Sequence, residues 1–229
     1  MPRLVAFDLD GTLVDSRQDL ADSANQLVVE RGGAPISLDA VTAMVGEGAA
    51  LLVRRALTAA GLSAEDPGAL RRFLEIYDGR LLATTALYPG IVDAVRAART
   101  GARVVVLTNK PLHHSERLLA GLGVRDLFDD VVGGDNPNGR KPAPQGLMAL
   151  MTAAGTTGRD TLMVGDSLVD LETARAAGAQ CCLASFGFGY ARISPSSIGD
   201  DTWVAASGTE LAALLRQFVG TPGRAAPTP

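Results

Sequence analysis

One short segment near the start of the chain constrains the fold most. An apolar run, Leu4-Val5-Ala6-Phe7, is followed directly by Asp8-Leu9-Asp10-Gly11-Thr12. Because side chains alternate along a strand, Asp8 and Asp10 lie on the same side of it, and Gly11 permits a sharp turn after them. Two carboxylates held this close repel each other unless a divalent cation or a cationic side chain lies nearby. We therefore predict a strand that ends in an active site.

Helical periodicity dominates the chain between this strand and residue 100. Ser16 and Ser37 are candidate N-caps, and glycines follow several of the segments. No convincing strand occurs in this stretch, which predicts a helical insertion over residues 16–84. The predicted helices cover residues 16–31, 37–45, 48–60 and 67–82, and a further helix follows at 91–99.

Beyond residue 100, apolar runs alternate with helical segments. The runs are continuous, which is typical of strands covered on both faces of a parallel sheet. They lie at residues 104–107, 130–133, 161–164 and 180–184, with a short edge strand at 203–204. Helices are predicted at 112–122, 145–154, 168–177 and 209–219. This alternation predicts an α/β fold with a doubly wound parallel sheet.

The predicted organisation is a core domain made of residues 1–15 and 85–220, the helical insertion at 16–84, and a disordered tail at 221–229. With 229 residues, 47% of them hydrophobic, and a formal net charge of −4, the chain has no basic run suited to nucleic acid or anionic lipid. No segment approaches the roughly 20 apolar residues of a membrane span. We expect a cytoplasmic protein without nucleic-acid or membrane partners.

The two cysteines support this expectation. Cys181 and Cys182 are adjacent in a strand-like run, where alternation sends their side chains to opposite faces. A disulfide between them would have poor geometry. We expect both to be buried, reduced thiols.

Polar side chains follow each predicted strand at its carboxyl end, where open α/β sheets bind ligands. Asp166 and Asp170 lie four residues apart at a helix start, so both can face one ligand, although Asp170 could equally serve as a helix N-cap. Three acids converge with only Lys141 to balance their charge, so they require a hard cation. Oxygen ligands beside a phosphate indicate that this cation is Mg²⁺. The candidate residues are Asp8, Asp10, Thr108, Asn109, Lys141, Asp166 and Asp170.

Together these residues resemble the four motifs of the haloacid dehalogenase superfamily of phosphohydrolases: Asp-x-Asp-Gly-Thr, a strand-terminal Thr, a loop Lys, and Gly-Asp-Ser-x-x-Asp. The resemblance implies a Rossmann-like core with an inserted α-helical C1 cap. It also implies that Asp8 is the nucleophile that forms an aspartyl-phosphate and that Asp10 is the general acid and base.

The same resemblance assigns the remaining motif residues. Thr108, Asn109 and Lys141 would hold the phosphoryl oxygens. Mg²⁺ would bind the Asp8 side chain, the Asp10 carbonyl and Asp166, with Asp170 supporting these ligands from behind.

Further segments resemble bacterial phosphoglycolate phosphatases within this superfamily. They are Val45-Gly46-Glu47-Gly48, Arg54-Arg55-Ala56-Leu57, Thr108-Asn109-Lys110-Pro111 and Gly133-Gly134-Asp135. The resemblance implies Mg²⁺-dependent hydrolysis of a small phosphomonoester, 2-phosphoglycolate, to glycolate and phosphate. The substrate carboxylate then requires a cation or backbone amides in the cap. We expect Gly46, Glu47 and Gly48 to supply the amides and Arg55 the cation, although Arg54 and Arg55 could also be solvated helix positions.

Several alternatives stay open. Other capped phosphatases act on sugar phosphates or pyrophosphate, and a phosphomutase of the β-phosphoglucomutase type uses the same core. Dehalogenases lack the second acid, which Asp10 supplies here. A phospho-aspartate signalling module is disfavoured because receiver domains carry the phosphorylated Asp on a later strand and have no helical insertion. We expect a monomer or homodimer, and we expect His113 and His114 to lie on a solvated surface, since no acid or Cys stands at ligand spacing from them.

Overall fold

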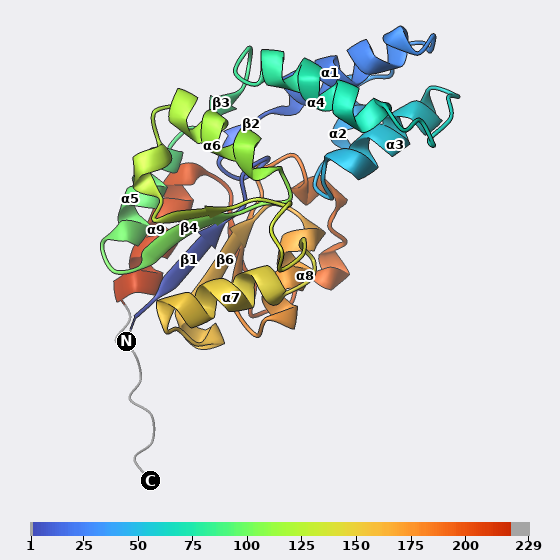
Figure 1. The fold of residues 1–229 in the computed structure, drawn as a ribbon. Helices are drawn as coiled ribbons and strands as arrows, with labels where there is room; N and C mark the ends of the chain where they lie inside the picture. Colours follow the sequence, from blue (N-terminus) through green and yellow to red (C-terminus); the bar gives the residue numbers. More distant parts are fainter. Residues whose placement is uncertain (1, 221–229) are drawn as a thin grey trace.

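The computed structural model describes residues 2–220 and contains a six-stranded sheet whose strand pairs are all parallel. The strand order is β5-β4-β1-β6-β7-β8, so the first strand, β1 (Leu4–Phe7), is central. The others are β4 (Arg103–Leu107), β5 (Asp130–Val132), β6 (Thr161–Gly165), β7 (Gln180–Ala184) and β8 (Trp203–Ala205). Figure 1 shows helices on both sides of this sheet. The predicted doubly wound parallel sheet is therefore confirmed.

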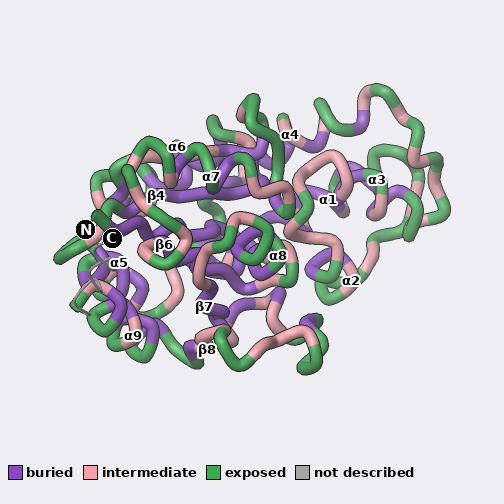
Figure 2. Tube along the Cα trace, turned by 90° about the horizontal axis from the view of Figure 1, so that it is seen from below, coloured by how far each residue is buried: buried purple, intermediate pink, exposed green. Residues whose placement is uncertain are grey.

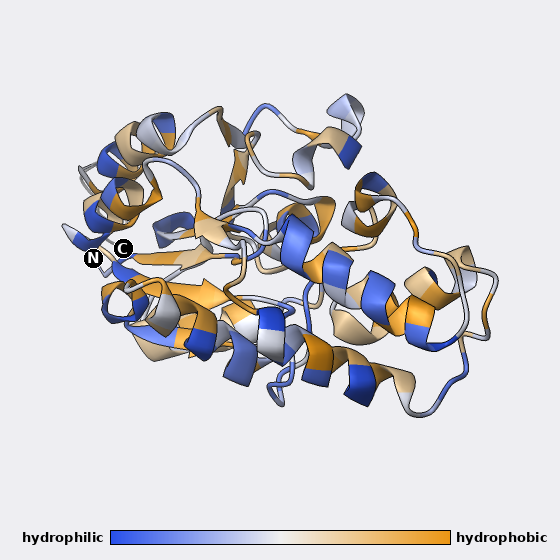
Figure 3. Cartoon of the chain, turned by 90° about the horizontal axis from the view of Figure 1, so that it is seen from above, coloured by the Kyte–Doolittle hydropathy of each residue, from blue (hydrophilic) through white to orange (hydrophobic). Residues whose placement is uncertain are grey.

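Alternation along the strands divides the core between the two faces of the sheet. Val5 and Phe7 pack with α5 (Ile91–Arg99), α6 (Leu112–Gly121) and α9 (Gly208–Gly220). Leu4 and Ala6 pack on the other face with α7 (Gln145–Ala154) and α8 (Leu168–Ala176). Covered on both sides, the strands are buried in Figure 2 and mainly hydrophobic in Figure 3. This is why each strand is a continuous apolar run in the sequence.

The cysteine prediction is also confirmed. Cys182 belongs to the first of these cores and Cys181 to the second, and both are buried free thiols. Burial raises the pKa of the Cys182 thiol to about 12, so it stays protonated near neutral pH.

Four helices leave the sheet after β1 and lie over the carboxyl ends of the strands (Figure 1). They are α1 (Arg17–Glu30), α2 (Leu38–Thr42), α3 (Ala49–Ala59) and α4 (Ala69–Arg80), and we call them the insert. Their apolar faces, which include Leu27, Leu57 and Phe73, pack against one another. The domain boundaries at 16–84, 1–15 and 85–220 stay a prediction, and the predicted tail at 221–229 lies outside the described residues.

The expectation of no strand between β1 and residue 100 is wrong. β2 (Val14–Asp15) and β3 (Ala86–Leu87) form an antiparallel pair where the chain enters and leaves the insert. Nearby, Asp19 accepts hydrogen bonds of 2.7–3.1 Å from the backbone amides and hydroxyls of Thr84 and Thr85. Strands of two residues have no detectable periodicity, and their pairing depends on segments far apart in the sequence. Among residues 2–220, no helix has the length and apolarity needed to cross a membrane.

Candidate active site

The parallel strands bring the predicted polar residues to one edge of the sheet. Asp8 follows β1, and its backbone amide donates to the carbonyl of Val164 at 2.8 Å. Since β4 and β6 flank β1, Thr108 and Asp166 lie on either side of Asp8. Lys141 reaches the same place from the loop after β5. All four of these side chains are buried, so the charged ones need compensating partners.

Lys141 supplies one such partner. Its ammonium lies 2.9 Å from Asp8 Oδ1 and 2.5 Å from Asp170 Oδ1. Burial opposes its charge, but the Asp170 and Asp8 carboxylates outweigh burial and raise the pKa of Lys141. The other oxygen of Asp170 accepts hydrogen bonds from the amide and hydroxyl of Ser167, at 3.1 and 2.6 Å, and completes a capping box on α8. Asp170 therefore both caps a helix and faces the site.

The carboxylates of Asp8, Asp166 and Asp170 form a buried cluster. Each offers an oxygen within 4.8 Å of the others. Burial and the neighbouring carboxylates of Asp170 and Asp8 raise the pKa of Asp166 well above its usual range. Burial raises the pKa of Asp8 to about 6, against the opposing effect of Lys141. The cluster therefore carries a surplus of disfavoured negative charge, and its donor set fits a hard divalent cation such as Mg²⁺.

Glycines make room for this cluster. Gly11 has a φ of +88°, and a Cβ there would lie 2.1 Å from Asp166 Oδ2. A Cβ on Gly187 would lie 2.3 Å from the Asp166 Cβ, and the amide of Gly189 donates to Asp166 Oδ2 at 2.7 Å. Gly187 and Gly189 lie in the loop after β7 and were not predicted as site residues. Their Gly-x-Gly spacing after the strand at 180–184 is the signal that could have placed them in the site.

Asp10 has different partners. Its carboxylate lies 2.9 and 3.0 Å from the ammonium of Lys110 and accepts a 2.6 Å hydrogen bond from the Ser16 hydroxyl. Ser16 is the N-cap residue of α1, as predicted, but its side chain makes no capping hydrogen bond. Lys110 was not predicted as a site residue. Its position directly after Thr108-Asn109 was the available signal.

Lys110 is itself buried against the insert. Its ammonium lies 4.5 Å from the centre of the Tyr77 ring, close enough for a cation–π interaction. Burial opposes the charge of Lys110, but Asp10 and Tyr77 outweigh it and raise its pKa. Burial also raises the pKa of Tyr77 to about 12, so its hydroxyl stays protonated.

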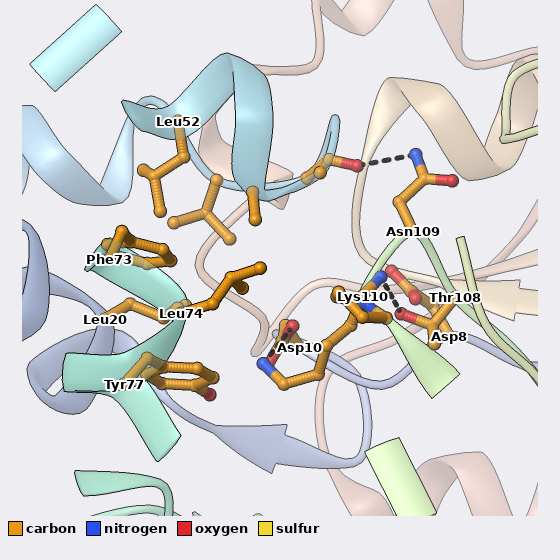
Figure 4. Close-up of a pocket in the computed structure, with 15 residues that line it drawn as sticks. Asp8, Asp10, Leu20, Leu52, Phe73, Leu74, Tyr77, Thr108, Asn109 and Lys110 are labelled. Atoms are coloured by element: carbon orange, nitrogen blue, oxygen red, sulfur yellow. Dashed lines mark hydrogen bonds and ion pairs between the residues drawn. The ribbon is translucent and has the colours of Figure 1, made fainter. Parts of the chain in front are cut away.

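A cavity of about 50 Å³ lies between the strand ends and the insert. This volume holds a few water molecules or a small ligand. Figure 4 shows Asp8, Thr108 and Asn109 on one side of it, and Leu20, Leu52 and Phe73 on the other, with Asp10 and Lys110 between them. The side of the cavity formed by the insert is therefore mainly apolar.

Asn109 connects the two sides of the cavity. Its side-chain amide donates to the carbonyls of Gly46 and Lys141, both at 2.9 Å. Arg192, from the loop after β7, makes a second connection by donating to the carbonyls of Thr42 and Val45, at 2.6 and 3.2 Å. No sequence motif indicated Arg192. These contacts hold the loop before α3 over the strand ends.

The predicted cap residues separate into two groups. Gly46 and Gly48 line the cavity. Arg55 instead pairs with Glu47 at 2.7 Å, with side chains 39% and 44% exposed, and lines an outer hollow of the insert. Arg54 lines the same hollow and pairs with Glu65. The cationic cap side chains therefore lie outside the cavity.

Two further sequence features acquire a structural explanation. A Cβ on Gly134 would lie 2.3 Å from the Asn109 carbonyl oxygen, so Gly133-Gly134-Asp135 lets the loop after β5 approach the site closely. His114 is buried, with its ring 5.7 Å from that of Tyr77, and this burial lowers its pKa. The expected solvated position holds for His113, whose side chain is 71% exposed, and is wrong for His114, because α6 packs against α4.

Comparisons with known proteins agree with this geometry. The model of the protein family described as haloacid dehalogenase-like hydrolase matches residues 2–178 of this chain. Phosphoglycolate phosphatase of Rhodospirillum rubrum is 44% identical over 207 residues, covering 87% of this chain and 85% of the relative. That of Pseudomonas putida is 40% identical over 212 residues, covering 88% and 77%. The crystal structure of a predicted phosphoglycolate phosphatase from Haemophilus somnus superimposes with a TM-score of 0.86 at 29% identity, covering 93% of this chain and 97% of that one.

Proposed function

The chain belongs to the haloacid dehalogenase-like hydrolases and is a phosphatase, and we propose that it hydrolyses 2-phosphoglycolate to glycolate and phosphate in the cytoplasm. Catalysis proceeds with Mg²⁺ and through an aspartyl-phosphate on Asp8. The observation that carries this proposal is the convergence of Asp8, Asp166, Asp170 and Lys141 at the carboxyl ends of parallel strands.

The carboxylate cluster supports the use of Mg²⁺. Three buried acids share a single close ammonium, that of Lys141, among the described residues, and the pKa values of Asp8 and Asp166 are raised. The Asp8 and Asp166 side chains and the Asp10 carbonyl would hold the ion, with Asp170 behind them. Mg²⁺, when bound, offsets the charge of the carboxylates and the phosphoryl group, so that an anion can attack an anion.

The first chemical step transfers the phosphoryl group to the protein. An Asp8 carboxylate oxygen attacks phosphorus, the bond from phosphorus to the glycolate oxygen breaks, and Asp10 gives that oxygen a proton. Thr108, Asn109 and Lys141 hold the phosphoryl oxygens. Asn109 does so through its backbone amide, because both hydrogens of its side-chain amide are donated to the carbonyls of Gly46 and Lys141. Phosphate binding and the position of the insert are therefore coupled through one residue.

The second step releases phosphate. Asp10 takes a proton from a water molecule whose oxygen attacks phosphorus, and the bond between Asp8 and phosphorus breaks. Lys110 and Ser16 lie at hydrogen-bond distance from the Asp10 carboxyl group and orient it for both proton transfers. The insert excludes other water from the cavity, which protects the intermediate from uncontrolled side reactions.

The substrate assignment is supported by cavity size and by the relatives. A cavity of about 50 Å³ suits a small leaving group better than a hexose, and the phosphatases of Rhodospirillum rubrum and Pseudomonas putida are named for phosphoglycolate. Phosphate release should be measured with phosphoglycolate, hexose phosphates and pyrophosphate. A preference for either of the last two would overturn the substrate assignment, and transfer of phosphate between sugar positions would favour a phosphomutase.

Metal binding has its own test, which does not depend on turnover. Mg²⁺ should raise the Tm of the wild-type protein, because it binds the folded cluster and not the unfolded chain. Asp166→Asn should abolish this rise, while an amide still accepts the hydrogen bond from Gly189. In the absence of metal the same variant should be more stable than wild type, since it removes a buried carboxyl group whose ionised form is disfavoured in the folded protein. Equal Mg²⁺ stabilisation of both proteins would contradict the assigned ligand.

A further inference from the structure

Beside Asp10, the cavity contains a second group of polar atoms. Among the residues that line it, Lys110 is the one cation, and its side chain is only 4% exposed. Tyr77 also lines the cavity and is buried, and its hydroxyl hydrogen has no acceptor among the described residues, since its neighbour Lys110 can only donate. A buried hydroxyl without an acceptor is costly, which indicates that a ligand or water satisfies it.

Both groups can donate further hydrogen bonds. Lys110 has three donor hydrogens, and the two Asp10 oxygens, at 2.9 and 3.0 Å, leave at least one of them for another acceptor. The Tyr77 ring lies 4.5 Å from the same ammonium. A carboxylate has two oxygens and therefore suits a site with an ammonium and a hydroxyl as donors.

The position of this pair relative to Asp10 determines which part of a substrate would reach it. In the proposed function, Asp10 gives its proton to the oxygen of the leaving group. Lys110 lies within 3.0 Å of both oxygens of Asp10. Its ammonium would therefore lie next to the carbon atoms of the leaving group, which are bonded to the oxygen that Asp10 protonates. The surrounding side chains of Leu20, Leu52 and Phe73 are apolar, and they exclude water that would screen a charge pair.

We propose that the Lys110 ammonium and the Tyr77 hydroxyl form the binding subsite for a carboxylate on the leaving group. This inference rests on the proposed function, and it assigns substrate recognition to a core lysine and an insert tyrosine. Arg55, the cation expected from the sequence, pairs with Glu47 outside the cavity. A carboxylate bound at this subsite would contact the core and the insert together and hold the cavity closed during the reaction.

The test compares two substrates of nearly equal size, 2-phosphoglycolate and 2-hydroxyethyl phosphate, which carries CH₂OH in place of the carboxylate. The ratio of their kcat/KM values measures carboxylate recognition and cancels effects on chemistry common to both. Lys110→Met should lower this ratio about tenfold to a hundredfold, and Tyr77→Phe about threefold to tenfold. Arg55→Met, which removes a cation from the outer hollow, should leave the ratio unchanged.

Two kinds of result would overturn the proposed subsite. A ratio unchanged in both Lys110→Met and Tyr77→Phe, or lowered by Arg55→Met alone, would overturn the subsite while leaving the proposed substrate intact. A wild-type enzyme without preference for phosphoglycolate would overturn the substrate and the subsite together. If Lys110→Met does not fold, Tyr77→Phe decides, because it keeps the ring that stacks on Phe73 and removes only the hydroxyl.

Discussion

Asp8 and Asp10 lie two residues apart at the end of one strand, yet their surroundings differ. Asp8 shares a buried cluster with Asp166 and Asp170, and Lys141 is the ammonium that contacts it. The Asp10 carboxylate pairs with one ammonium, that of Lys110, and accepts a hydrogen bond from one hydroxyl, that of Ser16. The first environment has surplus negative charge and the second is balanced. Two identical side chains can therefore perform different chemistry, because their neighbours differ.

The two environments also come from different parts of the molecule. The Asp8 cluster is built from residues that follow strands of the central sheet. The Asp10 environment includes Ser16, which directly precedes α1, and Tyr77 of α4, which contacts Lys110. A movement of the insert would therefore change the surroundings of Asp10 and leave the Asp8 cluster in place. The following variants test this contrast, starting with the largest expected effect.

Asp8→Asn should reduce kcat by a factor on the order of 10⁴ or more, because an amide is a poor nucleophile and no other described carboxylate takes the same position. Turnover of phosphoglycolate and trapping of phosphoenzyme are the measurements. The variant should keep its fold by circular dichroism. Substantial turnover in a folded Asp8→Asn protein would eliminate the covalent mechanism.

Asp10→Asn should reduce kcat by about 10²–10⁴-fold, the usual contribution of a general acid and base. Unlike the previous variant, it should still form some phosphoenzyme, since Asp8 is intact. Quenched-flow measurements would separate formation of the intermediate from its hydrolysis. If kcat matches that of wild type, Asp10 does not transfer the proton.

The raised pKa of Asp8 predicts a pH-dependent stability difference between metal-free Asp8→Asn and wild type. The pKa is about 6 in the folded protein against a usual value of 3.8. Between these values the folded state retains a proton that the unfolded state has lost, so this group destabilises the wild type progressively as pH rises. The unfolding free energy of Asp8→Asn minus that of wild type should grow by about 1–3 kcal/mol between pH 4 and 6.5 and then level off.

Urea unfolding of both proteins in EDTA, at several pH values, gives this difference directly. Titrating groups away from the cluster contribute equally to both proteins and cancel, whereas Asp166 and Lys141, whose pKa values depend on Asp8, also contribute to the measured difference. A difference that does not change with pH, or that shrinks as pH rises, would mean that Asp8 is not destabilised by burial. Adding Mg²⁺ should stabilise the wild type at pH 7 and thus narrow the gap.

The smallest effect is expected on the insert side, from Arg192→Gln. This change removes the hydrogen bonds that the guanidinium donates to the carbonyls of Thr42 and Val45, so closure of the cavity should weaken. We expect kcat/KM to fall by about twofold to tenfold, with the Asp8 cluster and Mg²⁺ stabilisation unaffected. Arg54→Gln, at a solvent-exposed ion pair with Glu65, is the matched control and should have no effect.

Local patterns in the sequence determined much of the core and its site. The continuous apolar runs predicted strands buried on both faces, and the parallel order then brought Asp8, Thr108 and Asp166 to one edge. The adjacent cysteines were assigned to opposite faces by alternation alone. These inferences succeed because strand and helix periodicities depend on backbone geometry within a few residues.

Tertiary structure alone decided the partners of each charge. The pairing of Lys110 with Asp10 joins residues 100 positions apart, and Tyr77, His114 and Arg192 acquire their roles only because the insert packs against the strand ends. The short strands β2 and β3 exist only as a pair. Likewise, helical spacing could not say whether Arg55 points into the cavity or pairs with Glu47 outside it, because a side chain's direction depends on how its helix packs, and that is set by contacts distant in sequence.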